Sequence, residues 1–149
     1  MIKGYTAGVF DLFHVGHLNI LKKAKSECDH LIVALTSDEL CFQRKGTRPF
    51  IPFLERKNIV HSIKYVDEVV PQIDMDKFAA WERYQFQKMF VGDDWKGHPT
   101  WEDLELRLKK VNCEVVFFPY TEGTSSTQLR NALKALSDGG KHIQRALNG

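Results

Sequence analysis

Cysteine is scarce in this sequence and long apolar runs are missing, and each shortage excludes a class of protein. The three cysteines, Cys28, Cys41 and Cys113, show no C-x-x-C spacing, so we expect neither a disulfide framework nor a cysteine metal site. The longest aliphatic run covers only residues 31–35, whereas a membrane-spanning helix needs ~20 residues. Residues 1–4 begin no signal-peptide pattern. We therefore expect a cytoplasmic protein without a membrane span.

Two sequence signatures of nucleotide-binding loops are absent as well. Neither G-x-G-x-x-G nor G-x-x-x-x-G-K-[ST] occurs, which disfavours NAD binding and P-loop chemistry. The net charge is only +2, so we expect no nucleic-acid partner bound by bulk charge. Residues 43–64 nevertheless carry six basic side chains against one acidic one, a local charge of +5. Such a patch is usually a solvated face, but it would also suit a compact anion such as a triphosphate.

Strand-like and helix-like segments alternate regularly along the chain. Its 149 residues, 43% apolar and 27% charged, are typical of one globular domain. Apolar periodicity predicts strands at residues 2–9, 31–36, 66–70, 88–91 and 115–118, separated and followed by helices at 15–28, from 52, 74–86, from 100 and from 125. This order predicts an α/β fold, a single Rossmann-like, doubly wound, parallel five-stranded sheet with helices on both faces. We expect one domain over residues 1–149, with a core of about 2–136 and a helical tail at 137–149.

Individual residues predict where some of these elements begin and end. Pro52 should open a helix, because its missing N–H falls where helix donors lack partners. Pro71 should end the third strand, and Thr100 should begin a capping arrangement for the next helix. Ser125 and Gln128 have the S-x-x-Q spacing of a capping box.

Two histidines flank a glycine where the first strand leads into the first helix. Ligands of doubly wound sheets bind beyond the carboxyl ends of the strands. There, a helix start offers free N–H groups and partial positive charge to an anion, and Gly16 lets a phosphate approach the backbone. His14 and His17 are three residues apart, so both rings lie on one side of the first turn and could bind one polyphosphate. A purely structural role remains the alternative, and no spacing supplies the third ligand that zinc would need.

The segment of residues 8–17, GVFDLFHVGH, resembles the HxGH signature of the nucleotidyltransferase superfamily, in the FDxxHxGH form of its cytidylyltransferase branch. Three later segments resemble successive motifs of the cytidylyltransferases that act on glycerol-3-phosphate: 64–69 (KYVDEV), 91–95 (VGDDW) and 121–127 (TEGTSST). The motifs stand in the same order and at matching intervals, so the resemblance extends from residue 2 to about 135.

The resemblance implies transfer of CMP from CTP to a small phosphate monoester, with release of pyrophosphate and no covalent intermediate. Glycerol-3-phosphate is the expected acceptor and CDP-glycerol the product, as needed for teichoic-acid or capsule-type polymers. Magnesium or another divalent cation would accompany the triphosphate, and a homodimer is expected. The alternatives are transfer of CMP or AMP to another sugar phosphate or phosphorylated alcohol, and a catalytically idle nucleotide-binding module.

The same resemblance implies roles for individual residues. His14 and His17 would stabilise charge on the leaving pyrophosphate, Lys45 and Lys64 would neutralise substrate phosphates, and Asp11 would orient a histidine or hold magnesium. The remaining nucleotide-binding candidates are Gly8, Val9, Phe10, Gly16, Gly92, Asp94, Trp95, Thr121, Ser125, Ser126, Thr127 and Arg130. Because residues 43–50 show little periodicity of their own, we expect a basic loop that closes over bound phosphates.

Three positions depart from the pattern of these cytidylyltransferases. Lys64 stands where they usually have arginine, which keeps the charge but loses the bidentate fork. Tyr120 replaces a phosphate-binding arginine, and Arg130, in the pattern S-S-T-x-x-R, is similar to the adenylyltransferase branch instead. The sequence therefore leaves the choice between CTP and ATP open.

Overall fold

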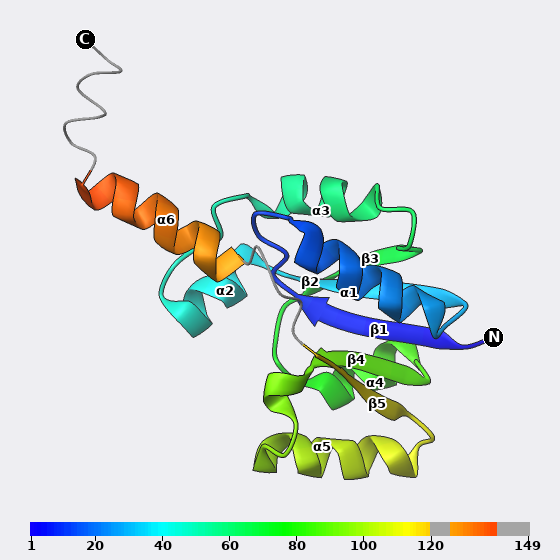
Figure 1. Cartoon of the computed structure of the whole chain (residues 1–149). Coiled ribbons are helices and arrows are strands. Elements are labelled where there is room, and N and C mark those ends of the chain that lie inside the picture. The colour runs from blue at the N-terminus through cyan, green and yellow to red at the C-terminus, as the bar shows by residue number, and fades with distance from the viewer. Residues whose placement is uncertain (120–125, 140–149) are drawn as a thin grey trace.

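The computed structural model describes residues 1–119 and 126–139 and is built on a five-stranded sheet (Figure 1). The strands are β1 (Lys3–Gly8), β2 (His30–Thr36), β3 (Glu68–Gln72), β4 (Lys88–Gly92) and β5 (Glu114–Phe118). All pairings are parallel and the order is β3-β2-β1-β4-β5. The predicted Rossmann-like fold is therefore confirmed, and the order changes direction at β1, where a ligand site is expected.

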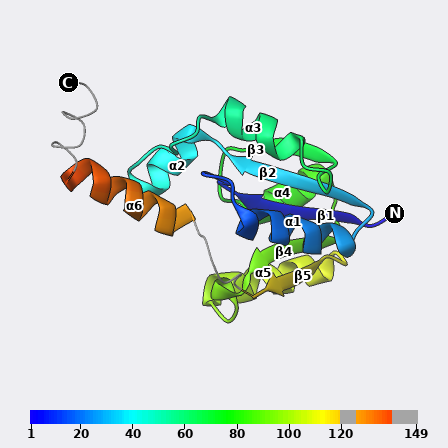
Figure 2. The same cartoon turned by 45° about the horizontal axis from the view of Figure 1, so that its top comes forward.

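Helices cover both faces of the sheet, as Figures 1 and 2 show. They are α1 (Val15–Ser26), α2 (Asp38–Lys45), α3 (Phe53–His61), α4 (Lys77–Tyr84), α5 (Pro99–Lys110) and α6 (Ser126–Gly139), with a short 3-10 turn η1 (Asp93–Trp95). Helices α1 and α3 pack on one face and α4 and α5 on the other. Helix α6 extends away from the sheet past α2. The predicted tail begins within α6, and residues 140–149 lie outside the described part of the chain.

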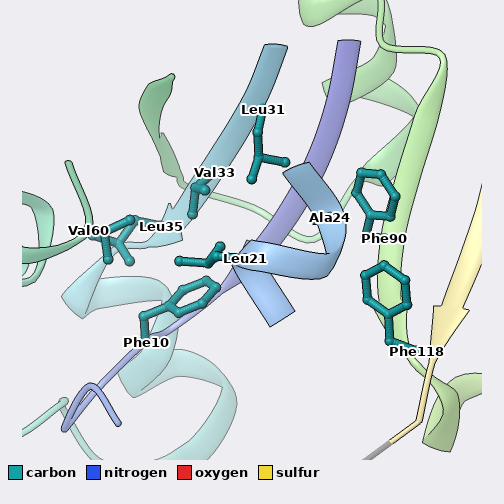
Figure 3. Close-up of a cluster of buried hydrophobic side chains, with 9 residues drawn as sticks. All are labelled: Phe10, Leu21, Ala24, Leu31, Val33, Leu35, Val60, Phe90 and Phe118. Atoms are coloured by element: carbon teal, nitrogen blue, oxygen red, sulfur yellow. The ribbon is translucent and has the colours of Figure 1, made fainter. Parts of the chain in front are cut away.

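The core is divided by the sheet into two clusters of buried side chains. On β2, Leu31, Val33 and Leu35 face α1 and α3, where they meet residues such as Leu21 (Figure 3). The alternate residues Ile32 and Ala34 face α4 and α5. Both faces of β2 are thus buried, which explains why its sequence is a continuous apolar run rather than an alternation.

Two prolines lie differently from their predicted places. Pro52 is the N-cap of α3 rather than its first residue, and its carbonyl accepts from the Arg56 N–H at 3.0 Å. The carboxylate of Asp38 accepts from the N–H of Phe53 at 3.3 Å and so serves the same helix start. Pro71 lies within β3 rather than ending it. An edge strand tolerates proline because one side of its ladder is unpaired.

The predicted basic loop at residues 43–50 is partly wrong, because α2 extends to Lys45. Ser37 caps this helix by accepting from the N–H of Leu40 at 3.1 Å. Gly46 ends it with φ of 76°, a left-handed conformation that glycine adopts without strain. An eight-residue helix is too short to show a clear apolar period, and its cap was the usable signal.

The last two helices begin close to their predicted starts. Helix α5 begins at Pro99 with His98 as its N-cap and no side-chain cap, so the cap predicted at Thr100 is wrong. Pro99 at the first helical position has no N–H group, so the start of α5 has one fewer donor that a capping side chain would have to satisfy. Helix α6 begins at Ser126, and the predicted capping residue Ser125 lies outside the described residues.

The cysteines Cys28, Cys41 and Cys113 are free thiols. In the described ranges, none of the helices combines the length and apolarity that crossing a membrane requires.

Candidate active site

A pocket of about 450 Å³ lies at the carboxyl ends of the strands. Every strand contributes to its wall, from Gln72 at the end of β3 to Phe118 at the end of β5. The predicted site residues that line it are Gly8, Val9, Phe10, His14, Gly16, His17, Lys45, Gly92, Trp95 and Thr127. Segments far apart in the sequence thus meet at the edge where the topology predicts a ligand.

The turn between β1 and α1 has a strained backbone. Phe10 and Leu12 have φ of 51° and 50°, a region that residues other than glycine adopt at a cost. A Cβ at Gly8 would lie 2.9 Å from a ring carbon of Phe10, so only glycine leaves room for this ring. The Phe10 ring is buried in the core and anchors the turn. The chain is thereby held in position as it enters the helix that carries the histidines.

His14 and His17 form a reciprocal capping box at the start of α1. His14 is the N-cap, and its Nδ1 accepts from the N–H of Gly16 at 3.0 Å. The N–H of His14 in turn donates to Nδ1 of His17 at 3.3 Å. Because Nδ1 is the acceptor in both rings, the proton of each neutral imidazole is on Nε2. The rings stack with centroids 4.0 Å apart, so two Nε2–H donors are paired beside the pocket.

Both histidines are neutral at physiological pH. Burial lowers the pKa of His17 to about 4, with the adjacent His14 as a second cause. Asp11 acts in the opposite direction and only partly offsets this effect. Burial also lowers the pKa of His14. The pair therefore offers hydrogen-bond donors rather than positive charge.

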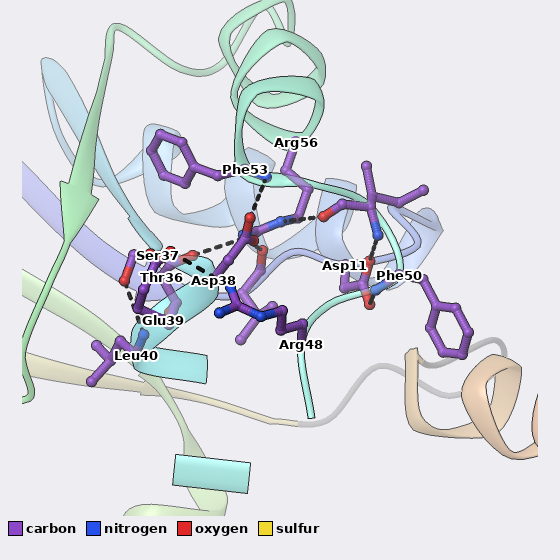
Figure 4. Close-up of polar contacts among 12 residues, drawn as sticks. Asp11, Thr36, Ser37, Asp38, Glu39, Leu40, Arg48, Phe50, Phe53 and Arg56 are labelled. Carbon is purple, nitrogen blue, oxygen red and sulfur yellow. Dashed lines mark hydrogen bonds and ion pairs between the residues drawn. The ribbon is translucent and has the colours of Figure 1, made fainter. Parts of the chain in front are cut away.

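Asp11 holds the strained turn against a distant segment. Its buried carboxylate accepts from the N–H of Phe50 at 2.8 Å (Figure 4). It also accepts from the N–H groups of Leu12 at 3.1 Å and Ile51 at 2.9 Å. Nε of Arg130 lies 4.0 Å from its Oδ2. The predicted role as a magnesium ligand does not fit, because these backbone donors already occupy a carboxylate without solvent access. Among the described residues, no cluster of three histidine, cysteine or acidic side chains could hold a metal ion.

Arg56 was counted in the exposed basic patch, and the structure buries it. Its guanidinium donates to the carbonyls of Ile51 at 2.7 Å, Val9 at 2.8 Å and Thr36 at 2.9 Å (Figure 4). Its charge is paired with Asp38 at 2.6 Å. Arg56 thus ties the ends of β1 and β2 to the same segment that Asp11 holds, and it contributes no charge to a ligand.

Among residues 1–119 and 126–139, three cationic side chains line the pocket, and two of them were missed as site residues. Lys45, a predicted site residue, is the last residue of α2, and burial together with the charge of Arg130 lowers its pKa. Arg44 precedes it, and Lys77 is the first residue of α4. Burial and the charge of Arg44 lower the pKa of Lys77 to about 8. No sequence signal pointed to Lys77, since its place depends on the topology.

Lys64 does not line the pocket. It lies in the connection that leads to the amino end of β3, opposite the strand ends that form the pocket. Its Nζ is 5.2 Å from the ring centroid of Tyr65. In the same motif, Asp67 accepts from the N–H of Leu31 at 2.8 Å and pairs with Lys25 at 2.6 Å. The motif thus joins β2 to β3 in this structure, and the predicted phosphate contact of Lys64 is not supported.

The later motifs bring aromatic side chains to the other end of the pocket. Trp95 lies in η1 together with Asp94, and its ring centroid is 5.8 Å from that of Trp101. Both tryptophans line the pocket. The predicted residues Thr121 and Ser125 lie outside the described part of the chain, as does the side chain of Ser126.

Neutral imidazole donors at a helix start, beside the carboxyl ends of parallel strands, suit the phosphates of a nucleotide. The fold and this site define an α/β nucleotidyltransferase. Residues 5–132 match the model of the cytidylyltransferase-like family, and the chain belongs to that family.

Several relatives cover most of the chain. Glycerol-3-phosphate cytidylyltransferase of Bacillus spizizenii is 36% identical over 137 residues, which span 91% of this chain and 100% of the relative. FAD synthase of Thermococcus sibiricus is 35% identical over 120 residues, 80% of this chain and 81% of that protein. A lipopolysaccharide core biosynthesis protein from Thermoplasma volcanium has the same fold, with a TM-score of 0.68 at 23% identity, covering 83% of this chain and 99% of that one.

Proposed function

We propose that this protein transfers CMP from CTP to glycerol-3-phosphate, giving CDP-glycerol and pyrophosphate. The observation that carries the proposal is the pair of Nε2–H donors at the start of α1, because these neutral groups can donate hydrogen bonds to the phosphates of a nucleotide. The acceptor is the one named for the Bacillus relative, which this chain matches over its full length.

The reaction needs no covalent intermediate and no general base. At neutral pH a phosphate monoester is largely a dianion, so its oxygen can attack the α-phosphorus of CTP directly. The new P–O bond forms as the bond to the bridging oxygen of the β-phosphate breaks, and pyrophosphate leaves. His14 and His17 donate hydrogen bonds that strengthen as charge grows on the leaving group.

Other residues bind and neutralise the triphosphate. Lys45 supplies charge from the end of α2, and Thr127 and Arg130 approach from α6. Trp95 and Trp101 form an apolar wall on which a base can lie. Thr121, Ser125, Ser126 and Asp94 remain predicted nucleotide contacts. We also propose that a divalent cation arrives with the triphosphate, neutralises part of its charge and makes no direct contact with Asp11.

The test is pyrophosphate release from four nucleoside triphosphates, each paired with a panel of phosphate monoesters. We expect turnover with CTP and glycerol-3-phosphate that chelation of divalent cations abolishes. A preference for ATP would replace the proposal with adenylyl transfer, to which the FAD synthase relative and Arg130 point. Binding of a triphosphate without turnover would indicate an idle nucleotide-binding module.

Assembly and location belong to the same proposal. We expect a cytoplasmic homodimer that supplies CDP-glycerol to teichoic-acid or capsule-type polymer synthesis. Light scattering of the purified protein measures the mass of the assembly, and a monomeric mass would contradict the expected dimer.

A further inference from the structure

Three aromatic rings contact the imidazole of His17. The ring centroid of Phe10 lies 5.1 Å from that of His17, and the ring centroid of Phe13 lies 5.2 Å from it. Both distances are in the range in which aromatic pairs attract each other. His14 stacks on the same imidazole at 4.0 Å. Phe10 is buried in the core and Phe13 packs against the same core cluster, so these rings connect His17 to the interior of the protein.

The hydrogen bond that orients His17 is weak by itself. The N–H of His14 donates to Nδ1 of His17 at 3.3 Å, which is longer than the ~2.7–3.2 Å of ordinary protein hydrogen bonds. The bond also requires an Nδ1 without a proton, because a protonated imidazole is a donor at both nitrogens. Burial, which lowers the pKa of His17, preserves that acceptor. The direction of the Nε2–H donor therefore depends on the packing of the ring as well as on the hydrogen bond.

Phe13 differs from Phe10 in its relation to the pocket. The described residues that line the pocket include Phe10 and both histidines but not Phe13. Phe13 is half-buried and immediately precedes His14, the N-cap of α1. An effect of Phe13 on turnover must therefore reach the substrate through a neighbouring residue.

We propose that Phe13 positions His17 for catalysis by holding its imidazole with Nδ1 at the His14 N–H, which leaves Nε2–H for the leaving pyrophosphate. The proposal rests on the proposed function and adds a positioning residue to it. Replacing Phe13 leaves in place the charged and titratable groups that face this imidazole, which are His14, Asp11 and Arg130. A variant of Phe13 thus isolates what the aromatic ring contributes.

The first measurement is an NMR titration of the histidines, which needs no turnover. Phe13→Ala should raise the pKa of His17 from about 4 toward the ordinary 6.5, because water reaches the imidazole. The nitrogen-15 shift of Nδ1 should show an unprotonated nitrogen down to about pH 4 in the wild type and a protonated one well above that pH in the variant. Phe53→Ala is the matched control, since Phe53 is a partly buried residue of α3 that packs against the same core cluster. It should leave the pKa of His17 unchanged.

The second measurement is kcat/KM for CTP between pH 5 and pH 8, which reports titration of the free enzyme. Dividing each variant by the wild type cancels the titration of CTP itself. For Phe13→Ala this ratio should fall by roughly 10-fold toward pH 5, where an imidazole of ordinary pKa is mostly protonated and wild-type His17 is mostly neutral. For Phe53→Ala the ratio should not depend on pH. If Phe13→Ala fails to fold, Phe13→Val keeps an apolar side chain too short to cover the imidazole and should show the same changes.

The outcomes separate this proposal from the proposed function. An unchanged pKa of His17 in the Phe13 variants would overturn the positioning role. A loss of kcat/KM that is independent of pH and shared with Phe53→Ala would also overturn it, because Phe13 would then only support the fold. Absence of pyrophosphate release by the wild type would overturn the proposed function, while the NMR titration alone would still decide whether Phe13 holds His17.

Discussion

Replacement of His14 separates its structural role from its chemical one. The side chain caps α1 through a single neutral hydrogen bond, from the Gly16 N–H at 3.0 Å. His14→Ala removes this cap at a cost of about 1 kcal/mol, which lowers the Tm of a domain of this size by roughly 2–4 °C. The second bond of the capping box is unaffected, because the backbone N–H of His14 donates it to His17.

The same substitution should lower kcat by on the order of 10²-fold, the usual loss when one donor to a developing anion is removed. His14→Ser is the informative control. Serine is a good N-cap, so it should keep the stability of the wild type, but it is too short to replace the Nε2–H donor and kcat should remain low. Urea unfolding and steady-state pyrophosphate release measure the two effects. A serine variant whose kcat lies within about threefold of wild type would refute the reasoning.

Three further perturbations test the interactions around this pair. Asp11→Asn should lower the free energy of unfolding by about 1.5–3 kcal/mol, because one carboxylate oxygen becomes an NH2 group that cannot accept from a backbone N–H and the remaining oxygen loses its charge; an unchanged urea midpoint would contradict that role. Lys45→Ala should raise the KM for CTP or lower kcat, whereas Gln43→Ala should do little, and equal small effects would mean that Lys45 is only a solvated helix end. His17 is neutral in the folded state down to about pH 4 and in the unfolded state only to about 6.5, so the unfolded chain binds more protons between these values. Stability should therefore fall with decreasing pH across that window by at most ~1.4 kcal/mol per pH unit from this residue, and His17→Gln should flatten the urea midpoint against pH.

The fold could be predicted from the sequence because local and global signals agree. The run at residues 31–35 is apolar throughout, and the structure buries both faces of that strand. The histidine pair was also predictable, since the motif places both rings on the first turn of a helix by spacing alone. Helix α2 was missed because its eight residues show no clear period.

Long-range contacts account for the residues that sequence reasoning placed wrongly. Arg56 and Lys57 look alike as neighbouring basic residues, yet one is buried among carbonyls and the other is exposed. Lys77 is remote from every recognised motif and reaches the pocket only because β3 ends there. Lys64 lies within a motif that reads as functional, but its strand begins at the opposite edge of the sheet. The sequence shows the sign of each side chain's charge, but the topology of the fold determines which groups that side chain contacts.

The contacts of Asp11 and Arg56 also limit how the pocket can close. Closure was predicted for residues 43–50, but residues 43–45 belong to α2, whose start is tied to Arg56 through Asp38. At the other end, Asp11 holds the N–H groups of residues 50 and 51, and Arg56 holds the carbonyl of residue 51. Only residues 46–49 lie between these attachments. Any larger closure must break bonds to buried charged groups, so we expect the predicted contact of Lys45 with a phosphate to depend on its side-chain rotamers and on a short hinge beginning at Gly46.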